Sequence, residues 1–174
     1  MPRWLLRDRR VVADDWRHLD ESADTLDSLD CADGGCSSRT GLIVPFVRWQ
    51  LEHQRWITRP RRLGVLLNPA QNPEDLAADL PRLALIAVQF PAASEGRGYS
   101  QGRQLRERWS FAGELRAVGS VRQDQLFFLA RCGFNAFELP EGELESARAG
   151  FTTFTAEYQF SNDTGLAGTL RHRQ

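Results

Sequence analysis

The chain has 174 residues, of which 41% are hydrophobic and 26% charged, so it is large enough for one domain with an adequate core. Its formal net charge is −1 and the basic residues do not collect in one arm, which excludes the electrostatic footprint of a non-specific nucleic-acid binder. All 22 basic residues are arginine, which removes Schiff-base chemistry and a P-loop lysine from consideration.

Residues 1–40 are predicted to form an N-terminal hairpin followed by a flexible connection. Apolar runs at 4–6 and 10–12 flank a polar Asp8-Arg9 turn, a pattern typical of a short hairpin or edge extension. Few large apolar side chains occur between Asp20 and Thr40, so the burial of apolar surface would not offset the conformational entropy that this stretch loses on ordering. No apolar run has the length of a signal-peptide core or a membrane span, so we expect a cytoplasmic protein with no membrane partner.

Residues 41–160 are predicted to form a single α/β domain on a mainly parallel sheet, because short apolar runs alternate with amphipathic stretches. Five βα units are too few for an eight-unit barrel, so we expect an open sheet or a half-barrel, and the local pattern is the same for both. Strands are expected at 42–44, 64–67, 83–90, 114–118 and 136–139, and helices at about 46–57, 73–80, 100–109, 121–132 and 142–157. Residues 161–174 are expected to be a disordered tail.

Three short signals predict where these helices begin and end. Asn72 before Pro73 is typical of an N-cap followed by proline at the first helical position. Ser120 and Gln123 have the spacing of a capping box. Gly133 is placed to end the same helix in the left-handed conformation.

Candidate site residues gather where the predicted strands end, which is where ligands bind in parallel α/β folds. In the segment 95–100, two glycines would let backbone amides approach a ligand, and the next helix would contribute its positive N-terminus. An arginine and a serine there suit a sulfur or phosphorus oxyanion or a carboxylate. A glycine turn that serves no ligand is the competing interpretation. The predicted anion-binding residues are Gln89, Gly96, Arg97, Gly98, Tyr99, Ser100, Arg116, Arg122 and Glu138.

Two of these arginines have more specific expectations. Arg116 lies two residues after Glu114 in a predicted strand, so both point to one face, and a structural ion pair is the favoured interpretation. Arg122 would oppose the dipole of the helix that it opens, which favours contact with an anion, whereas Asp124 suits that dipole.

No metal site, catalytic triad or dinucleotide fingerprint is visible, so the sequence assigns neither a cofactor nor a catalytic residue. Cys31 and Cys36 lack the further cysteines of an iron–sulfur cluster, and three cysteines in a reducing compartment do not predict disulfides. Cys132 is expected on an apolar helix face as a small core residue. The three histidines are scattered, and no G-x-G-x-x-G follows the first strand.

An ordered series of motifs resembles a bacterial family known only as domain of unknown function 934, over about residues 42–159. It comprises Asp79-Leu80, Arg82-Leu83, Phe90-Pro91, Gly96–Ser100, Leu105–Arg108, Gly113–Gly119 and Asp124–Phe134. The resemblance implies a partner of sulfite reduction, since members are usually encoded beside assimilatory sulfite reductase and often labelled oxidoreductases. This sequence departs from the family pattern with Glu95, Gly102, Ser120 and Asn135, where aspartate, alanine, aspartate and aspartate are expected. The Ser120 change puts in doubt any reaction that needs a carboxylate there.

Three functions remain open at this point. The first is an accessory protein or oxidoreductase component of assimilatory sulfite or sulfate reduction, with an oxyanion site and sulfite reductase or another sulfur-assimilation enzyme as partner. The second is an independent small-molecule enzyme acting on an anionic substrate at the strand ends. The third is an interaction module without catalytic activity.

Overall fold

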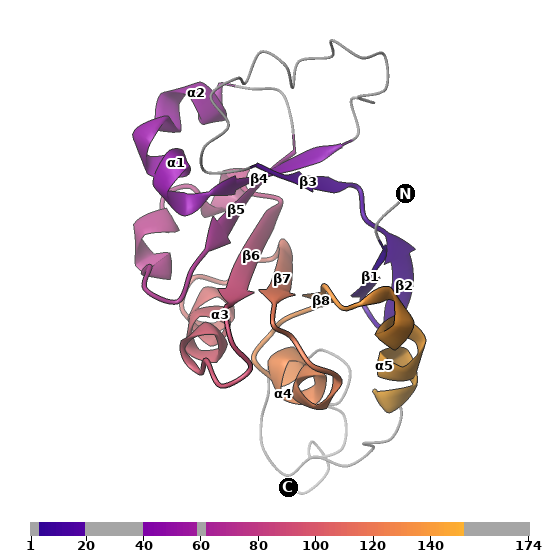
Figure 1. Cartoon of the computed structure of the whole chain (residues 1–174). Coiled ribbons are helices and arrows are strands. Elements are labelled where there is room, and N and C mark those ends of the chain that lie inside the picture. Colours follow the sequence, from indigo (N-terminus) through magenta and orange to yellow (C-terminus); the bar gives the residue numbers. More distant parts are fainter. Residues whose placement is uncertain (1–3, 20–39, 59–61, 152–174) are drawn as a thin grey trace, which may run out of the picture.

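The computed structural model describes residues 4–19, 40–58 and 62–151, and in this part of the chain one curved sheet forms a half-barrel (Figure 1). The strand order is β2-β1-β8-β7-β6-β5-β4-β3. The strands are β1 (Trp4–Arg7), β2 (Arg10–Ala13), β3 (Trp16–His18), β4 (Gly41–Pro45), β5 (Leu63–Leu67), β6 (Leu85–Phe90), β7 (Glu114–Gly119) and β8 (Ala136–Phe137). Strands β3 to β8 pair in parallel, whereas β1 is antiparallel to both β2 and β8.

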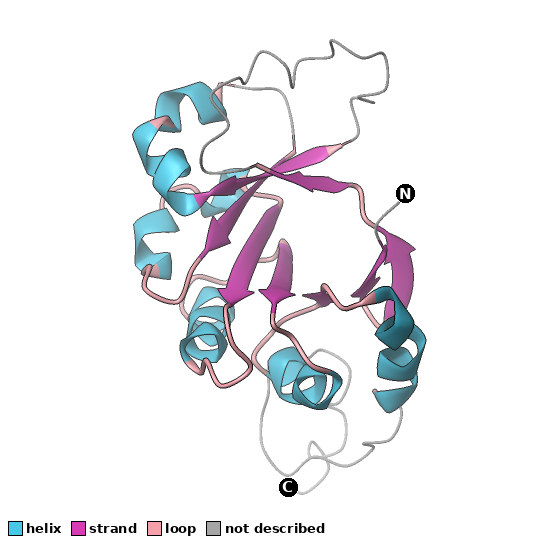
Figure 2. Cartoon of the chain, in the orientation of Figure 1, coloured by secondary structure: helices cyan, strands magenta, loops and turns pink. Residues whose placement is uncertain are grey.

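Helices cover the outer face of this sheet (Figure 2). The α-helices are α1 (Phe46–Leu51), α2 (His53–Ile57), α3 (Arg97–Glu107), α4 (Leu126–Arg131) and α5 (Leu144–Gly150). Short 3-10 helices are η2 (Pro73–Leu76), η3 (Leu80–Arg82), η4 (Gln123–Gln125) and η5 (Glu141–Glu143). Alternation along the strands sends one set of side chains, including Val65, Ile86 and Leu115, into the main core beneath the helices.

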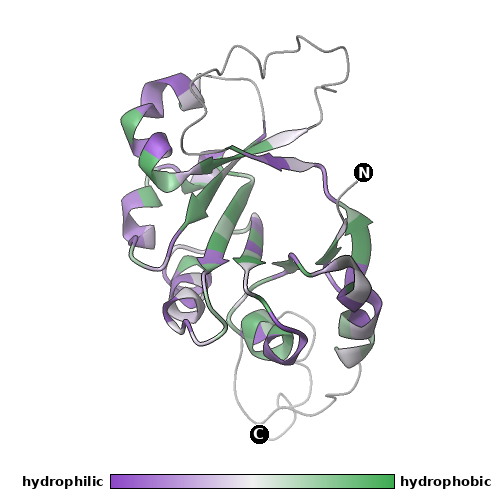
Figure 3. Ribbon diagram, viewed as in Figure 1, coloured by the Kyte–Doolittle hydropathy of each residue, from purple (hydrophilic) through white to green (hydrophobic). Residues whose placement is uncertain are grey.

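The inner face of the sheet has its own smaller core and a few charged groups. Leu85 and Ala87 of β6 pack there with Trp16 and Ile43, and the register aligns Ala87 with Arg116 of β7. In Figure 3, β4 and β5 are mostly green, whereas β3 is mostly purple and purple bands cross β7. The inner face therefore places a charge inside the half-barrel.

Most predicted strands and the hairpin are confirmed, and the half-barrel was one of the two expected architectures. The sheet nevertheless has eight strands and not five, because the hairpin joins it through β1 and because β3 was not predicted. β3 has only three residues, Trp-Arg-His, which is too short to show a period of two. Its pairing with β4 depends on a partner that is more than 20 residues away in the sequence.

Two predictions of where a helix begins differ from the structure. The predicted helix at 73–80 begins as the 3-10 helix η2, although Asn72 does accept a hydrogen bond from the amide of Glu74 (3.1 Å) as expected of a cap. The predicted capping box at Ser120 is wrong. Ser120 Oγ instead donates to the carbonyl of Pro91, and the helical turns begin later, at Gln123.

Glycine conformations explain the second error. Gly119 has a φ of +95°, and this turn lets the amide of Ser120 donate to the carbonyl of Phe90 (2.7 Å). Ser120 therefore ties two loops together and does not cap a helix. Gly133, with a φ of +99°, follows the end of α4 in the left-handed conformation, so that prediction is confirmed. The predicted tail at 161–174 and most of the predicted connection lie outside the described residues.

Candidate functional site

The inner face of the half-barrel is organised around Arg116. Its side chain is fully buried and projects from the middle of β7, next to the small residues Ala87 and Ala136 on the neighbouring strands. An isolated buried guanidinium would be costly, so the surrounding residues must supply negative charge and hydrogen-bond acceptors. The chain supplies both from three separate segments.

Three carboxylates surround the Arg116 guanidinium. Arg116 Nε donates to Glu114 Oε1 (2.8 Å), and Nη1 donates to both oxygens of Asp14 (3.1 Å each) and to Glu138 Oε1 (3.1 Å). Burial would lower the pKa of Arg116, but the charges of Glu114, Asp14 and Glu138 outweigh it and raise that pKa above its ordinary value. The guanidinium is therefore permanently charged.

A second ring of contacts connects this cluster to the edge strands. His18 Nε2 of β3 lies 3.0 Å from Glu138 Oε1, and Arg7 of β1 donates to Glu114 Oε2 (3.2 Å). Asp14 also accepts a hydrogen bond from the backbone amide of Trp16 (3.1 Å). We call Asp14, Glu114, Arg116, Glu138, His18 and Arg7 the interior charge cluster.

The interior charge cluster holds the two ends of the sheet together. Asp14 and Asp15 join β2 directly to β3, so the chain crosses between the two edge strands of the sheet in two residues (Figure 1). Asp14 anchors that crossing to β7 through Arg116, and Asp15 forms an ion pair with Arg62 at the start of β5. The cluster is thus a structural link between residues far apart in the sequence.

The segment at 95–100 follows β6 and includes the start of α3. Arg97 is 65% exposed and pairs with Glu95: its Nε and Nη2 donate to the two carboxylate oxygens at 2.9 and 3.0 Å. The amide of Arg97 also donates to Glu95 Oε1 (3.0 Å). These hydrogen bonds lower the pKa of Glu95 to about 2. The Glu95 carboxylate, which precedes α3, therefore accepts from the first amide of that helix, where an external oxyanion would also bind.

The two glycines of this segment have different roles. A Cβ at Gly98 would lie 2.5 Å from the ring of Phe90, so glycine is needed there for α3 to approach β6. A Cβ at Gly96 would meet nothing within 4 Å. Tyr99 packs edge-on against Phe90 with ring centroids 5.5 Å apart, and burial raises the pKa of its hydroxyl. Packing thus accounts for Gly98 and Tyr99, and open space surrounds Gly96.

The loop after β7 lies against the loop after β6. Gln125 Nε2 donates to the carbonyl of Ala93 (2.7 Å), and Ser120 Oγ donates to that of Pro91 (3.2 Å). Arg122, whose side chain is 70% exposed, lies 3.5 Å from Asp124. Two exposed arginines, Arg97 at the start of α3 and Arg122 just before η4, therefore stand at the same end of the sheet, and we call residues 91–100 and 120–125 the rim.

The structure divides the predicted site residues into two groups. Arg116 and Glu138 are in direct contact, and the predicted pair of Arg116 with Glu114 is confirmed. The expectation that Arg116 opens onto the rim with the glycine turn is wrong, because its side chain is fully buried inside the half-barrel. The remaining predicted residues, Gln89, Gly96, Arg97, Gly98, Tyr99, Ser100 and Arg122, lie on β6 or the rim, where Ser100 is exposed and Gln89 half-buried.

Sequence reasoning missed His18, Asp14 and Arg7 as members of the cluster. They belong to a segment whose contacts with Glu138, Arg116 and Glu114 span more than 100 residues. The only sequence signal was an Asp14-Asp15 pair between two apolar runs, which also suits an exposed turn. In the described residues no group of three or more histidine, cysteine, aspartate or glutamate side chains is arranged to hold a metal ion.

The fold and the buried cluster define a class: an α/β half-barrel with an ion-paired interior and an arginine-bearing rim at the carboxyl ends of its strands. Among the described helices none is long and apolar enough to span a bilayer.

A family model described as a bacterial protein of unknown function (DUF934) matches residues 64–167, which is more than half of the chain. The chain belongs to this family. A search of curated proteins finds no match.

Proposed function

We propose that this protein is an accessory component of assimilatory sulfite reduction that binds the reductase through its rim and carries an oxyanion site there. The observation that carries the proposal is the position of Arg97 and Arg122, two exposed guanidinium groups at the carboxyl ends of parallel strands. Each is paired with a carboxylate of its own segment, Glu95 or Asp124, which a bound oxyanion would displace. Guanidinium groups bind oxyanions through paired, charge-assisted hydrogen bonds. The family resemblance directs the choice of sulfite as the oxyanion.

The interior charge cluster favours an accessory role over an independent enzyme. Glu138 and Asp14 would be natural acid–base groups, but each already accepts hydrogen bonds from the buried Arg116. Both carboxylates therefore contact a cation of the chain itself, and the side chain of Asp14 is almost fully buried. The polar groups left accessible at the strand ends are then those of the rim, which suit binding.

Helix α4 adds an apolar contact to this surface. Phe128 of α4 is 59% exposed. Interfaces between proteins are enriched in aromatic and arginine side chains. An exposed Phe128 on the helix that follows Arg122 therefore supports a protein partner.

Binding to assimilatory sulfite reductase tests the proposal directly. The purified chain is immobilised and the reductase passed over it, with the Arg97→Ala, Arg122→Ala double variant and an Arg103→Ala control, which removes an exposed arginine paired with Glu107 on α3. We expect the double variant to lose about tenfold or more in affinity and the control to match the parent. Absence of binding by the parent would refute the accessory role.

The oxyanion site needs a separate measurement. Calorimetry with sulfite, sulfate and phosphate should show heat of binding to the parent and weaker binding to Arg97→Ala at unchanged stability. No binding by the parent would remove the anion site while leaving the docking role intact. A visible absorption spectrum of the purified protein independently tests the oxidoreductase label by revealing a bound flavin or cluster.

A further inference from the structure

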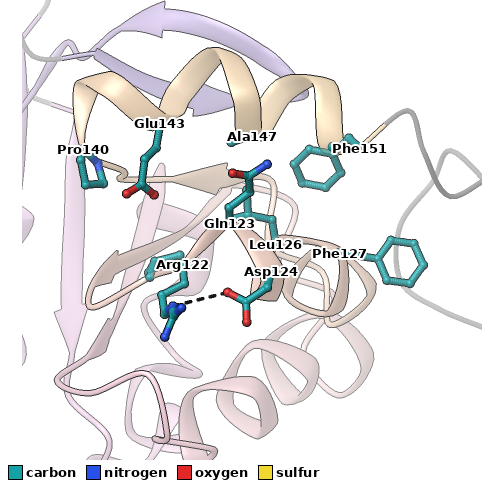
Figure 4. Close-up of a pocket in the computed structure, with 11 residues that line it drawn as sticks. Arg122, Gln123, Asp124, Leu126, Phe127, Pro140, Glu143, Ala147 and Phe151 are labelled. Carbon is teal, nitrogen blue, oxygen red and sulfur yellow. Dashed lines mark ion pairs between the residues drawn. The ribbon is translucent and has the colours of Figure 1, made fainter.

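A groove lies between α5 on one side and η4 with α4 on the other, outside the half-barrel (Figure 4). Its volume is about 900 Å³. Val121 and Arg122 line it from the segment that follows β7, and Pro140 and Glu143 line it from the segment that follows β8. The groove is therefore at the carboxyl ends of two paired parallel strands, which is where parallel α/β proteins bind ligands.

The two ends of the groove differ in chemistry. Arg122 and Glu143, which are both exposed, lie at the end away from Phe151 (Figure 4). Buried side chains of the main core form an apolar floor, and these are Val121, Leu126, Ala147 and Phe151. A ligand that suits the whole groove therefore has an apolar body and a charged head.

Hydrogen bonds fix the distance between the two walls of the groove. Gln123 Nε2 donates to the carbonyl of Ser146 (3.0 Å), and Ser146 Oγ lies 3.3 Å from Gln123 Oε1. Ser146 Oγ also donates to the carbonyl of Glu143 (2.9 Å). Because these contacts join η4 directly to α5, the groove is preformed, and binding needs little rearrangement of the chain.

The charges of the lining decide which head group fits. Among the described lining residues there is one cationic side chain, Arg122, and there are two anionic ones, Asp124 and Glu143. Arg122 Nε lies 3.5 Å from Asp124 Oδ1, and the two side chains are 70% and 75% exposed, so water screens this pair. Within the groove a plain anion would be repelled by Glu143 and a plain cation by Arg122. A zwitterion satisfies both signs.

We propose that the groove binds a zwitterion with a large apolar body, the chemistry that free aromatic or aliphatic amino acids share with short peptides of such residues. The carboxylate of the ligand pairs with Arg122, its ammonium group pairs with Glu143, and its apolar body covers the floor. Guanidinium groups bind carboxylates through paired hydrogen bonds, and burial of apolar surface adds affinity. The site shares Arg122 with the rim, but the inference does not rest on the proposed role in sulfite reduction.

Calorimetry with the full chain tests this ligand class, with L-tryptophan and the dipeptide leucyl-leucine as probes. We expect saturable binding of at least one probe at millimolar concentration or below, and the probe that binds identifies a free amino acid or a peptide as the source. Indolepropionate lacks the ammonium group of tryptophan and tryptamine lacks its carboxylate, so each should bind about threefold to tenfold more weakly. N-acetylation and C-terminal amidation remove the same charges from the dipeptide. Absence of binding of both probes to the parent, or equal binding of the analogues that carry one charge, would overturn the proposal.

Variants of α5 test the role of Glu143. Glu143→Gln should weaken binding of the zwitterion about threefold to tenfold, but it should not weaken binding of the analogue that lacks an ammonium group. Glu145→Gln removes another exposed carboxylate of the same helix, which pairs with Arg148, and should bind like the parent. Equal affinity of Glu143→Gln and the parent for the zwitterion would contradict the assigned contact.

Amide NMR shifts locate the ligand independently of these variants. Titration of the parent with the probe that binds should shift amides at 121–127 and 143–151, on the two walls of the groove. Shifts confined to other segments would place the ligand elsewhere and refute the site.

Discussion

Replacing Arg116 with methionine tests whether the interior charge cluster stabilises the fold. Methionine keeps much of the volume but removes the charge, so three carboxylates lose their central partner. Breaking a buried ion pair by removing one partner costs roughly 3–5 kcal/mol. Here Glu114 keeps Arg7 and Glu138 keeps His18, whereas Asp14, among the described residues, keeps only its bond from the amide of Trp16.

Because the three carboxylates keep these other partners, we expect a loss at the lower end of that range, about 3 kcal/mol in the free energy of unfolding. For a domain of this size each kcal/mol lowers the melting temperature by roughly 2–4 °C, so Arg116→Met should melt about 6–12 °C below the parent. Urea unfolding followed by tryptophan fluorescence measures the free energy, and circular dichroism the melting temperature.

Two further variants make the test specific. Arg116→Lys keeps a positive charge, but a lysine cannot reach all three carboxylates. Its free energy of unfolding should therefore fall by less than that of Arg116→Met, by about 1–2 kcal/mol. Asp14→Asn in the Arg116→Met background should recover part of the loss, because the uncompensated carboxylate is gone. If Arg116→Met unfolds within about 1 kcal/mol of the parent, the cluster does not hold the two sheet edges and the reasoning fails.

Four other predictions concern single positions. Gly98→Ala should lower the free energy of unfolding by about 1–3 kcal/mol, because the new Cβ would lie 2.5 Å from the Phe90 ring. Gly96→Ala, which meets open space, should change it by less than about 0.5 kcal/mol. Equal losses in the two variants would contradict the packing argument. Glu95 has a lowered pKa of about 2, so its pairing is complete above its ordinary value of 4.5 and is lost as pH falls through about 2, which a carboxyl NMR titration would follow. Glu95→Gln removes that internal anion and should tighten sulfate binding in calorimetry; weaker binding would show that the carboxylate does not compete. Burial raises the pKa of the Cys132 thiol, so in a variant whose other cysteines are serine its alkylation should have a midpoint above the ordinary value of 9.0.

Local patterns predicted the elements whose stabilising contacts are close in sequence or repeat within the element. The apolar run of β6, the cap at Asn72 and the left-handed Gly133 each carry their physical reason within a few residues. The hairpin was visible for the same reason, since β1 and β2 flank one short turn. Of the candidate site, the pair of Glu114 and Arg116 was predictable from the period of a strand.

The sequence by itself determined the class of fold, the parallel strands and the rim loops. Only the tertiary structure decided that β3 joins the sheet, that Arg116 lies inside the half-barrel, and that Asp14 and His18 reach its neighbourhood. The physical reason is the distance along the sequence between the contacting residues. Alternation within a strand predicts which of its residues share a face, but the carboxylates that compensate a buried charge are those that the curvature of the sheet brings close to it. That curvature depends on the pairing of all eight strands together.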